Sequence, residues 1–173
     1  MREYFLITER CGFSKWETKD TELARLLWGE PEVTHFICAS GVFKDEEIEC
    51  RLETEIRNGE LYGVQYWPLF ERNTGELIGC CGLRPFEGEE RAYELGCHLR
   101  EKYWGKGIAK EAAEAVIAYG FGILGAQKLL AGHHPQNIRS GKVLKKLGFT
   151  PIGEKFYEPT GLFHPAYELT KPV

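Results

Sequence analysis

The 173 residues, 43% hydrophobic and 28% charged, have the composition of one globular domain. No apolar run is long enough for a signal peptide or a membrane span, and no basic, aromatic-rich strip indicates nucleic-acid binding. The six cysteines show no metal-ligand spacing, so reduced structural thiols in the cytoplasm are expected. We therefore expect a single domain over residues 1–173 that holds no metal and contacts neither membrane nor nucleic acid.

The net charge of −4 is unevenly placed along the chain. Residues 1–99 hold 11 Lys and Arg against 20 Asp and Glu, whereas residues 100–155 hold 10 against 4. Residues 156–173 hold 1 against 2. The basic segment suits an anionic ligand and the acidic segment a cationic one, unless the charges simply cluster on solvated faces.

The first quarter of the chain predicts short elements. Phe5 to Trp16 is expected to form one bent strand or a strand pair. Asp20 is placed to cap a short helix that ends at Gly29, and Pro31 starts a further helical turn. Asp45 is expected to cap a firmer helix that ends at Asn58-Gly59, with an apolar face of Ile48, Leu52 and Ile56.

A hairpin is expected next, with strands from Leu61 to Leu69 and from Leu77 to Leu83 around a turn at 73–76. The following strand, Ala92 to Leu99, alternates between apolar and polar side chains. From Ile108 the apolar residues recur at three- and four-residue spacing, which predicts an amphipathic helix.

The last part predicts a short strand from Lys128 to Gly132, a loop, and a helix that begins at Asn137 and ends at Gly148. Strands from Thr150 to Phe156 and from Pro165 to Leu169 complete the sheet. The order of elements indicates one α/β domain with antiparallel hairpins and helical crossovers.

Gly105-Lys106-Gly107 lies where the predicted strand gives way to the long helix. The first turn of a helix has unpaired N–H groups and a positive end of the helix dipole, and glycines let that backbone wrap a phosphate. A tight turn alone would also explain the glycines. A dinucleotide-binding loop would need a third glycine where Lys110 stands, and a Walker A loop is absent.

The segment 102–107, Lys-Tyr-Trp-Gly-Lys-Gly, resembles the acetyl-CoA loop Gln/Arg-x-x-Gly-x-Gly/Ala of the GNAT superfamily of N-acetyltransferases, with Lys102 as a departure in the first place. Glu94-x-Gly96 just before it, Asn137 at the next helix and Lys146-Leu147-Gly148-Phe149 at its end agree with that resemblance. The opening Leu-x-Thr-Glu-Arg of residues 6–10 is similar to the branch of ribosomal-protein-alanine N-acetyltransferases (RimJ/RimL-like).

The resemblance implies an α/β (α+β) fold with a mixed, mostly antiparallel central sheet, two splayed strands and flanking helices. Acetyl-CoA is the implied cosubstrate, with its pantetheine arm between the splayed strands. The implied cofactor-binding residues are the backbone groups of Leu99 and Arg100, the amides of Trp104, Gly105, Lys106, Gly107, Ile108 and Ala109, the side chain of Asn137, and the cations Lys106, Arg139 and Lys142. Each of these three cations is equally consistent with simple solvation.

Acetyl transfer to an amine needs a base, because an ammonium has no free electron pair. Glu94 is the first candidate, since it resembles the carboxylate that the family usually carries on this strand, and a surface role is the alternative. His98, on the same side of the strand, is the second candidate, against a structural histidine. His133 and His134 could line the acceptor site, but adjacent strand residues point apart and suit a metal poorly.

The proton donor is less clearly marked. Leu144 stands where many family members have a tyrosine, Ser140 matches a hydroxyl found in the RimJ/RimL-like branch, and Tyr157 is a further candidate. Five aromatic residues could form an acceptor pocket, although packing in the core or at its rim is the favoured role for most of them. They are Tyr62, Tyr66, Trp67, Phe70 and Phe163.

The leading hypothesis is an acetyl-CoA-dependent N-acetyltransferase that acts on a primary amine, by direct attack in a ternary complex. Leu144 in the tyrosine position favours the alternative, a catalytically inactive CoA-binding sensor or interaction module. The acceptor is open between a protein N-terminus, a polyamine, an aminoglycoside and an amino-acid-like metabolite. An exposed edge strand near the C-terminus would permit a homodimer.

Overall fold

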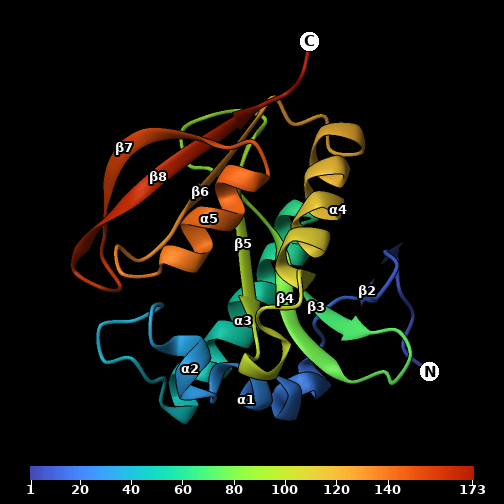
Figure 1. Ribbon diagram of the computed structural model, residues 1–173. Helices are drawn as coiled ribbons and strands as arrows, with labels where there is room; N and C mark the ends of the chain where they lie inside the picture. Colours follow the sequence, from blue (N-terminus) through green and yellow to red (C-terminus); the bar gives the residue numbers. More distant parts are fainter.

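One open sheet of eight strands runs through the computed structural model, which describes residues 1–173. The strands lie in the order β1-β2-β3-β4-β5-β6-β8-β7. Their bounds are β1 Leu6–Ile7, β2 Cys11–Phe13, β3 Tyr66–Glu71, β4 Leu77–Pro85, β5 Ala92–Leu99, β6 Lys128–Gly132, β7 Thr150–Tyr157 and β8 Leu162–Thr170. All neighbouring strands are antiparallel except β5 and β6, which run parallel (Figure 1). The predicted mixed, mostly antiparallel sheet is therefore confirmed.

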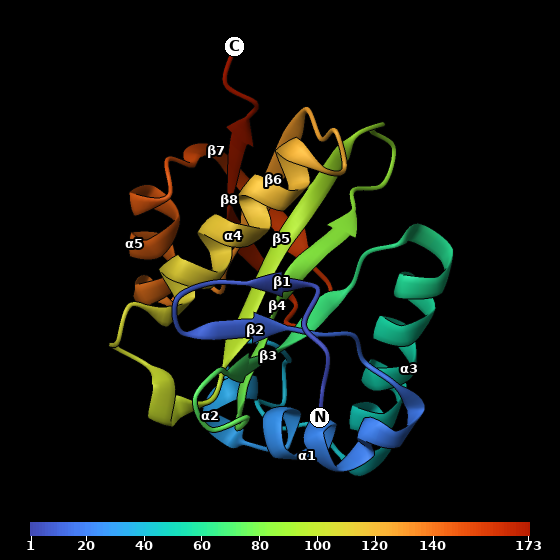
Figure 2. The same ribbon diagram turned by 90° about the vertical axis from the view of Figure 1, so that its right-hand side faces the viewer.

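Helices cover the two faces of this sheet. They are α1 (Thr21–Trp28), α2 (Pro31–Thr34), α3 (Asp45–Tyr62), α4 (Ile108–Gly122) and α5 (Ile138–Lys146), with 3-10 turns at Thr18–Asp20 and Glu101–Tyr103. Figure 2 shows α4 and α5 on one side of the sheet and α3 on the other, while α1 and α2 close one end. None of these helices has the length and apolarity that a membrane span requires.

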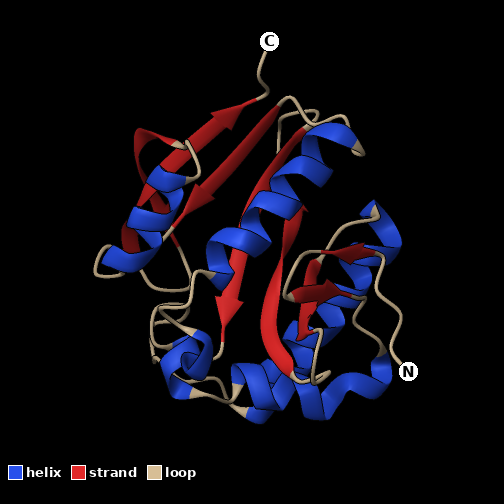
Figure 3. Cartoon of the chain, turned by 45° about the vertical axis from the view of Figure 1, so that its right-hand side comes forward, coloured by secondary structure: helices blue, strands red, loops and turns tan.

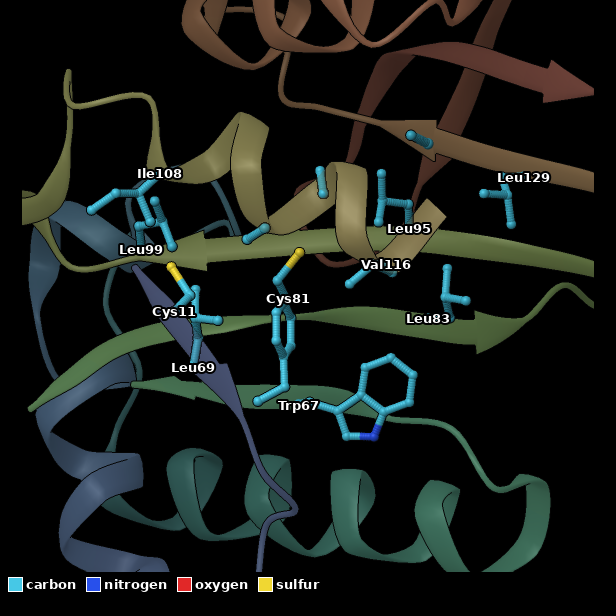
Figure 4. Packing of buried hydrophobic residues seen from close by; sticks show 14 of the residues in the cluster. Cys11, Trp67, Leu69, Cys81, Leu83, Leu95, Leu99, Ile108, Val116 and Leu129 are labelled. Carbon is cyan, nitrogen blue, oxygen red and sulfur yellow. The ribbon is translucent and has the colours of Figure 1, made fainter. Parts of the chain in front are cut away.

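The sheet has an apolar core on each face because side chains alternate along its central strands. Cys80 of β4 packs with α1 and α3, whereas its neighbour Cys81 packs on the α4 side. Figure 4 shows the α4 side, where Leu95 and Leu99 of β5 lie in the same cluster as Val116. This packing holds β5 and α4 rigidly against each other, at the two ends of the glycine loop.

The elements on either side of the glycine loop have the predicted bounds, but the predicted N-terminal caps of α1 and α3 are wrong. Asp20 occupies the position before α1, yet its carboxylate accepts hydrogen bonds from Arg2 and from the Glu17 N–H rather than capping the helix. The residue before α3 is Lys44, whose N–H donates to Glu47 at 2.7 Å. The expected cap by Asp45 is therefore wrong.

The predicted end of α3 at Gly59 is also wrong. The helix continues to Tyr62 and ends at Gly63, whose φ of 70° is left-handed. Gly59 instead makes room for Gln65, since a Cβ there would meet Gln65 Nε2 at 2.6 Å. Consequently β3 starts at Tyr66, five residues later than the strand expected from Leu61.

Strands β5 and β6 separate soon after they meet. They pair only at Ala92–Lys128, Tyr93–Leu129 and Glu94–Leu130. Beyond Glu94, β5 continues to Leu99 along β4 alone, while β6 stays paired with β8 as far as Gly132 (Figure 3). The predicted splay is thus present, and Glu94 stands at its apex.

Candidate active site

The glycine loop presents unpaired backbone donors. Gly105 and Gly107 have φ angles of 71° and 76°, a region that glycine enters without strain. None of the N–H groups from Gly105 to Lys110 donates to an acceptor in the protein. A Cβ on Gly105 would meet no atom within 4 Å, so the space beside the loop is open. Free N–H groups at the positive end of α4 make this loop fit for a diphosphate.

Arg10, in the turn between β1 and β2, holds this loop in place. Its Nη1 donates to the carbonyl of Lys106 at 2.8 Å, and its Nε donates to Glu111 on the first turn of α4 at 2.6 Å. Thr8 Oγ1 donates to the other carboxylate oxygen of Glu111 at 2.6 Å. The Thr-Glu-Arg segment therefore fastens the N-terminal arm to the loop and its helix.

Leu99 points its backbone into the gap between β5 and β6. The N–H of Arg100 donates to the carbonyl of Ile78 on β4. Because the N–H groups of successive strand residues point to opposite sides, the N–H of Leu99 points away from β4 and toward the gap. The Leu99 carbonyl accepts the indole N–H of Trp104 at 2.8 Å. Arg100 already has partners for its N–H and its carbonyl, which leaves Leu99 as the better placed of the two for the pantetheine arm.

The three predicted phosphate cations carry no carboxylate partner. Lys106 lies over the Tyr103 ring at 5.6 Å, Arg139 lies over Trp104 at 5.4 Å, and Lys142 is exposed on α5. No ion pair involves any of them, although many other cations of the chain have one. Their charge is therefore available to an anion near the loop.

Asn137 and Ser140 lie at the start of α5. The Asn137 side chain accepts from the Ser140 N–H at 3.3 Å, so it caps the helix. The Ser140 hydroxyl has no hydrogen-bond partner in the protein. Leu144, one turn further on, is buried in the core beside β6 and cannot donate a proton.

The carboxylate of Glu94 is held by a buried tyrosine. Tyr66 of β3 crosses over Gly96, where a Cβ would meet its ring at 2.2 Å, and its hydroxyl donates to Glu94 at 3.2 Å. Gly96 is needed because the ring lies flat against the strand. Glu94 is thus a half-buried carboxylate, at the apex of the gap, with a fixed orientation.

A buried ion cluster lies next to Glu94. Glu55 of α3 is completely buried, accepts the N–H of Tyr66 at 2.7 Å and pairs with Arg51 at 3.1 Å and with Arg84. Arg84 lies 4.2 Å over the Tyr66 ring and is the cross-strand partner of Glu94. The cluster places positive charge beside the candidate base.

His98 is held as a neutral ring. Its Nδ1 accepts the indole N–H of Trp28 at 3.3 Å. Loss of hydration and the nearby charges of Arg51 and Arg84 lower its pKa well below the ordinary 6.5. A ring with one nitrogen occupied and a poor affinity for protons is a weaker base candidate than Glu94.

A family model that matches most of the sequence shows which family this chain belongs to. The sequence model described as "Acetyltransferase (GNAT) domain" matches residues 10–150. This chain belongs to the GNAT acetyltransferase family. It is 32% identical over 149 residues to "Uncharacterized N-acetyltransferase p20" of Bacillus licheniformis, covering 86% of this chain and 83% of that protein. Over 51% of the chain it is 34% identical to the "[Ribosomal protein uS5]-alanine N-acetyltransferase" of Escherichia coli, 46% of which is covered.

Solved structures agree with this assignment. The GNAT-family acetyltransferase from Bacillus anthracis superposes with a TM-score of 0.79 at 26% identity, over 95% of this chain and 97% of that one. The fold is also shared with RimL, a ribosomal L7/L12 acetyltransferase solved with coenzyme A, at a TM-score of 0.80 and 15% identity over 97% and 98% of the chains. The protein is therefore an acetyltransferase of the GNAT family, and it has the GNAT fold.

The two adjacent histidines of this GNAT enzyme have different surroundings. His133 packs beneath α5, with Nε2 3.1 Å from the Tyr167 hydroxyl. His134 turns outward and, with His35 and Cys38, lines a cavity of about 220 Å³ beside the β7–β8 hairpin. Of the two histidines predicted to line the acceptor site, His134 borders this cavity and His133 does not.

Sequence reasoning missed Arg84, Arg51 and Glu55. One signal could have found two of them, because Arg51 and Glu55 are spaced i, i+4 on α3, but nothing in the sequence marked Arg84 as their partner. Of the predicted acceptor-side aromatic residues, Tyr66 alone contacts Glu94. Trp67 and Phe70 are buried in the two cores, and Tyr62 and Phe163 are exposed.

Proposed function

We propose that this enzyme transfers the acetyl group of acetyl-CoA to a primary amine by direct attack in a ternary complex, with Glu94 as the base. The observation that carries the proposal is the position of Glu94, at the apex of the β5–β6 gap and oriented by the Tyr66 hydroxyl. The amine acceptor is also supported by the relative that acetylates ribosomal-protein alanine.

In this proposal Glu94 accepts a proton from the ammonium, directly or through a water molecule. The freed electron pair of nitrogen forms a bond to the thioester carbon, and the nitrogen then loses a second proton to water. The carbon–sulfur bond breaks, and the thiolate takes up a proton. Ser140 and Tyr157 are the proposed side chains for that last step. A free backbone N–H of β5 would stabilise the developing negative charge on the carbonyl oxygen.

The proposed cofactor site combines the elements around the loop. The amides from Trp104 to Ala109 hold the diphosphate, and Lys106, Arg139 and Lys142 balance the remaining phosphate charge. Backbone groups of Leu99, with Arg100 beside it, and the side chain of Asn137 hold the pantetheine arm. The assignments from Gly105 to Ala109 are supported by unpaired N–H groups, and those of the three cations by their lack of a carboxylate partner. The Trp104 N–H, by contrast, already donates to the Glu101 carbonyl at 2.9 Å, so it would have to exchange that partner for a phosphate.

The test is release of free thiol from acetyl-CoA with a panel of primary amines, in wild-type protein and in Glu94→Gln. We expect turnover by the wild type, a loss of at least about 100-fold in kcat in the variant, and unchanged affinity for acetyl-CoA. Glu114→Gln, on the exposed side of α4, is the matched control and should keep full activity. Tight binding of acetyl-CoA without turnover of any amine would instead support the sensor.

A further inference from the structure

Arg84 and Glu94 form a pair of opposite charges at the apex of the gap. They are register partners on β4 and β5, so their side chains leave the sheet on the same face. No ion pair joins the two, because Arg84 turns to Glu55 and Glu94 turns to the Tyr66 hydroxyl. The face thus offers a carboxylate and a guanidinium side by side, each held by another group.

The guanidinium side of this pair has unsatisfied hydrogen-bond donors. Arg51 and Arg84 share the single carboxylate of Glu55, whose second oxygen is occupied by the Tyr66 N–H. Arg84 Nε and Arg51 Nη2 are buried without a hydrogen-bond partner, and an anion that accepted from them would stabilise the cluster. The Arg84 side chain is still 26% exposed and that of Arg51 14%, so Arg84 is the one that a small ligand can reach more readily.

A row of aromatic rings borders the cavity beside the β7–β8 hairpin. The ring centroid of Tyr157 lies 4.7 Å from that of His164, His164 lies 5.5 Å from His134, and His134 lies 5.0 Å from Phe36. Burial raises the pKa of the Tyr157 hydroxyl.

The cavity itself carries no negative charge. Its lining includes His35, Cys38, Ser40, His134 and Thr160, and no Asp or Glu. Burial and the neighbouring histidines lower the pKa values of His134 and His164, which keeps the rings neutral near pH 7. At about 220 Å³ it is smaller than the roughly 300–1,000 Å³ of drug-sized sites. It suits a small uncharged group better than a polyamine or an aminoglycoside.

A cluster of acidic residues lies nearby but outside this cavity. The carboxylates of Glu30, Glu32 and Glu101 lie within 4.8 Å of one another. Glu30 accepts hydrogen bonds from Arg100 and from the Glu101 N–H, and Glu32 lines a second hollow with Trp104, which shares His35 with this cavity. None of the three carboxylates lines the cavity itself.

We propose that the acceptor is an α-amino acid, with its ammonium at Glu94 and its carboxylate at Arg84. This rests on the proposed function, since the amine must reach Glu94 to be acetylated. Arg84 is the specificity determinant: it recognises the carboxylate that separates an amino acid from the corresponding simple amine.

The test uses matched sets of acceptors with wild-type enzyme at saturating acetyl-CoA. The sets are leucine, leucinamide and isoamylamine; tyrosine, tyrosinamide and tyramine; and histidine, histidinamide and histamine, with spermidine and an alanyl peptide beside them. In one or more sets, we expect kcat/KM for the amino acid to be at least about tenfold higher than for its decarboxylated amine. That factor corresponds to the free energy of one charge-assisted hydrogen bond between the carboxylate and Arg84. Equal or better turnover of the simple amines in every set, or a preference for spermidine or the peptide, overturns the proposal.

Arg84→Gln gives the second readout. In this variant the ratio of kcat/KM for the amino acid to kcat/KM for the amine should fall toward one. Arg57 is an exposed residue of α3 without an ion pair, so Arg57→Gln should keep the wild-type ratio. A ratio unchanged in Arg84→Gln overturns the assignment of Arg84.

Calorimetry of the amino acids with the wild-type protein–CoA complex separates the two proposals. Binding that Arg84→Gln abolishes, without turnover, supports this subsite and contradicts the catalytic function. No binding at millimolar concentration contradicts the subsite, whatever the enzyme acetylates. The acceptor sets and the search for binding use wild-type protein, so the proposal can still be overturned if Arg84→Gln does not fold.

Discussion

Arg10 donates from Nε to Oε2 of Glu111 across 2.6 Å, and its Nη1 reaches the carbonyl of Lys106 at 2.8 Å. One side chain from the N-terminal arm thus fixes both the glycine loop and the helix that follows it. The loop has to keep its N–H groups unpaired to bind a diphosphate, so its shape cannot come from its own hydrogen bonds. The fixed shape comes from Arg10 instead.

Arg10→Ala should weaken acetyl-CoA binding more than it weakens the fold. Loss of the contact to Lys106 lets the loop move, and we expect Kd to rise about five- to tenfold, equivalent to roughly 1 kcal/mol. Titration calorimetry measures the change. Arg25→Ala removes a comparable exposed ion pair with Glu22 on α1 and should leave Kd unchanged; an equal loss in that control would refute the role of Arg10.

Gly107→Ala should abolish tight binding of the cofactor. A non-glycine residue at a φ of 76° costs about 1–2 kcal/mol and shifts the backbone that faces the phosphates. Gly125→Ala is the matched control, because Gly125 has a φ of 67°, has open space around it and lies beyond the far end of α4. Both variants should lose similar stability in thermal unfolding, but Gly125→Ala should keep its affinity for coenzyme A.

Glu55→Gln should destabilise the protein strongly. The change leaves Arg51 and Arg84 without their buried anion, and breaking such a pair costs about 3–5 kcal/mol. Urea unfolding should show a lower midpoint, whereas Glu49→Gln, at an exposed ion pair of the same helix, should change the free energy of unfolding by about 1 kcal/mol or less. Comparable midpoints for the two variants would contradict the importance of the cluster.

Acid should destabilise the protein through its histidines. The folded-state pKa values of His98, His134 and His164 lie below the ordinary 6.5, so below about pH 6.5 the unfolded chain binds more protons than the folded one. The free energy of unfolding should therefore fall as the pH decreases from 7 toward 5. His98→Asn should make the free energy of unfolding less dependent on pH in this range. A wild-type free energy of unfolding that rises as the pH decreases from 7 to 5 would contradict this prediction.

Much of the site's framework was predictable from local sequence. Ala92 to Leu99 alternates cleanly, and the apolar spacing after Ile108 admits only a helix, so the bounds around the loop follow from periodicity. No local pattern in the sequence shows where β5 and β6 part. The splay was predicted only from the resemblance to the family motif.

The remaining errors have physical causes. Gly59 looked like the end of a helix, but it is a glycine because the Gln65 side chain packs against it. Asp20 looked like a cap, but Arg2, 18 residues away in the chain, binds its carboxylate. The cluster of Glu55, Arg51 and Arg84 joins a helix to a strand by contacts distant in sequence. Local patterns carry no information on such contacts, which is why Arg84 was missed.

The central claim is that the unpaired amides of the glycine loop hold the diphosphate of the cofactor. Calorimetric titration of the folded wild-type protein with coenzyme A and with pantetheine, which has no diphosphate, tests it most directly. We predict that coenzyme A binds at least about 100-fold more tightly, the equivalent of roughly 2.7 kcal/mol. Equal affinity for the two molecules, or no heat with coenzyme A, would contradict the account.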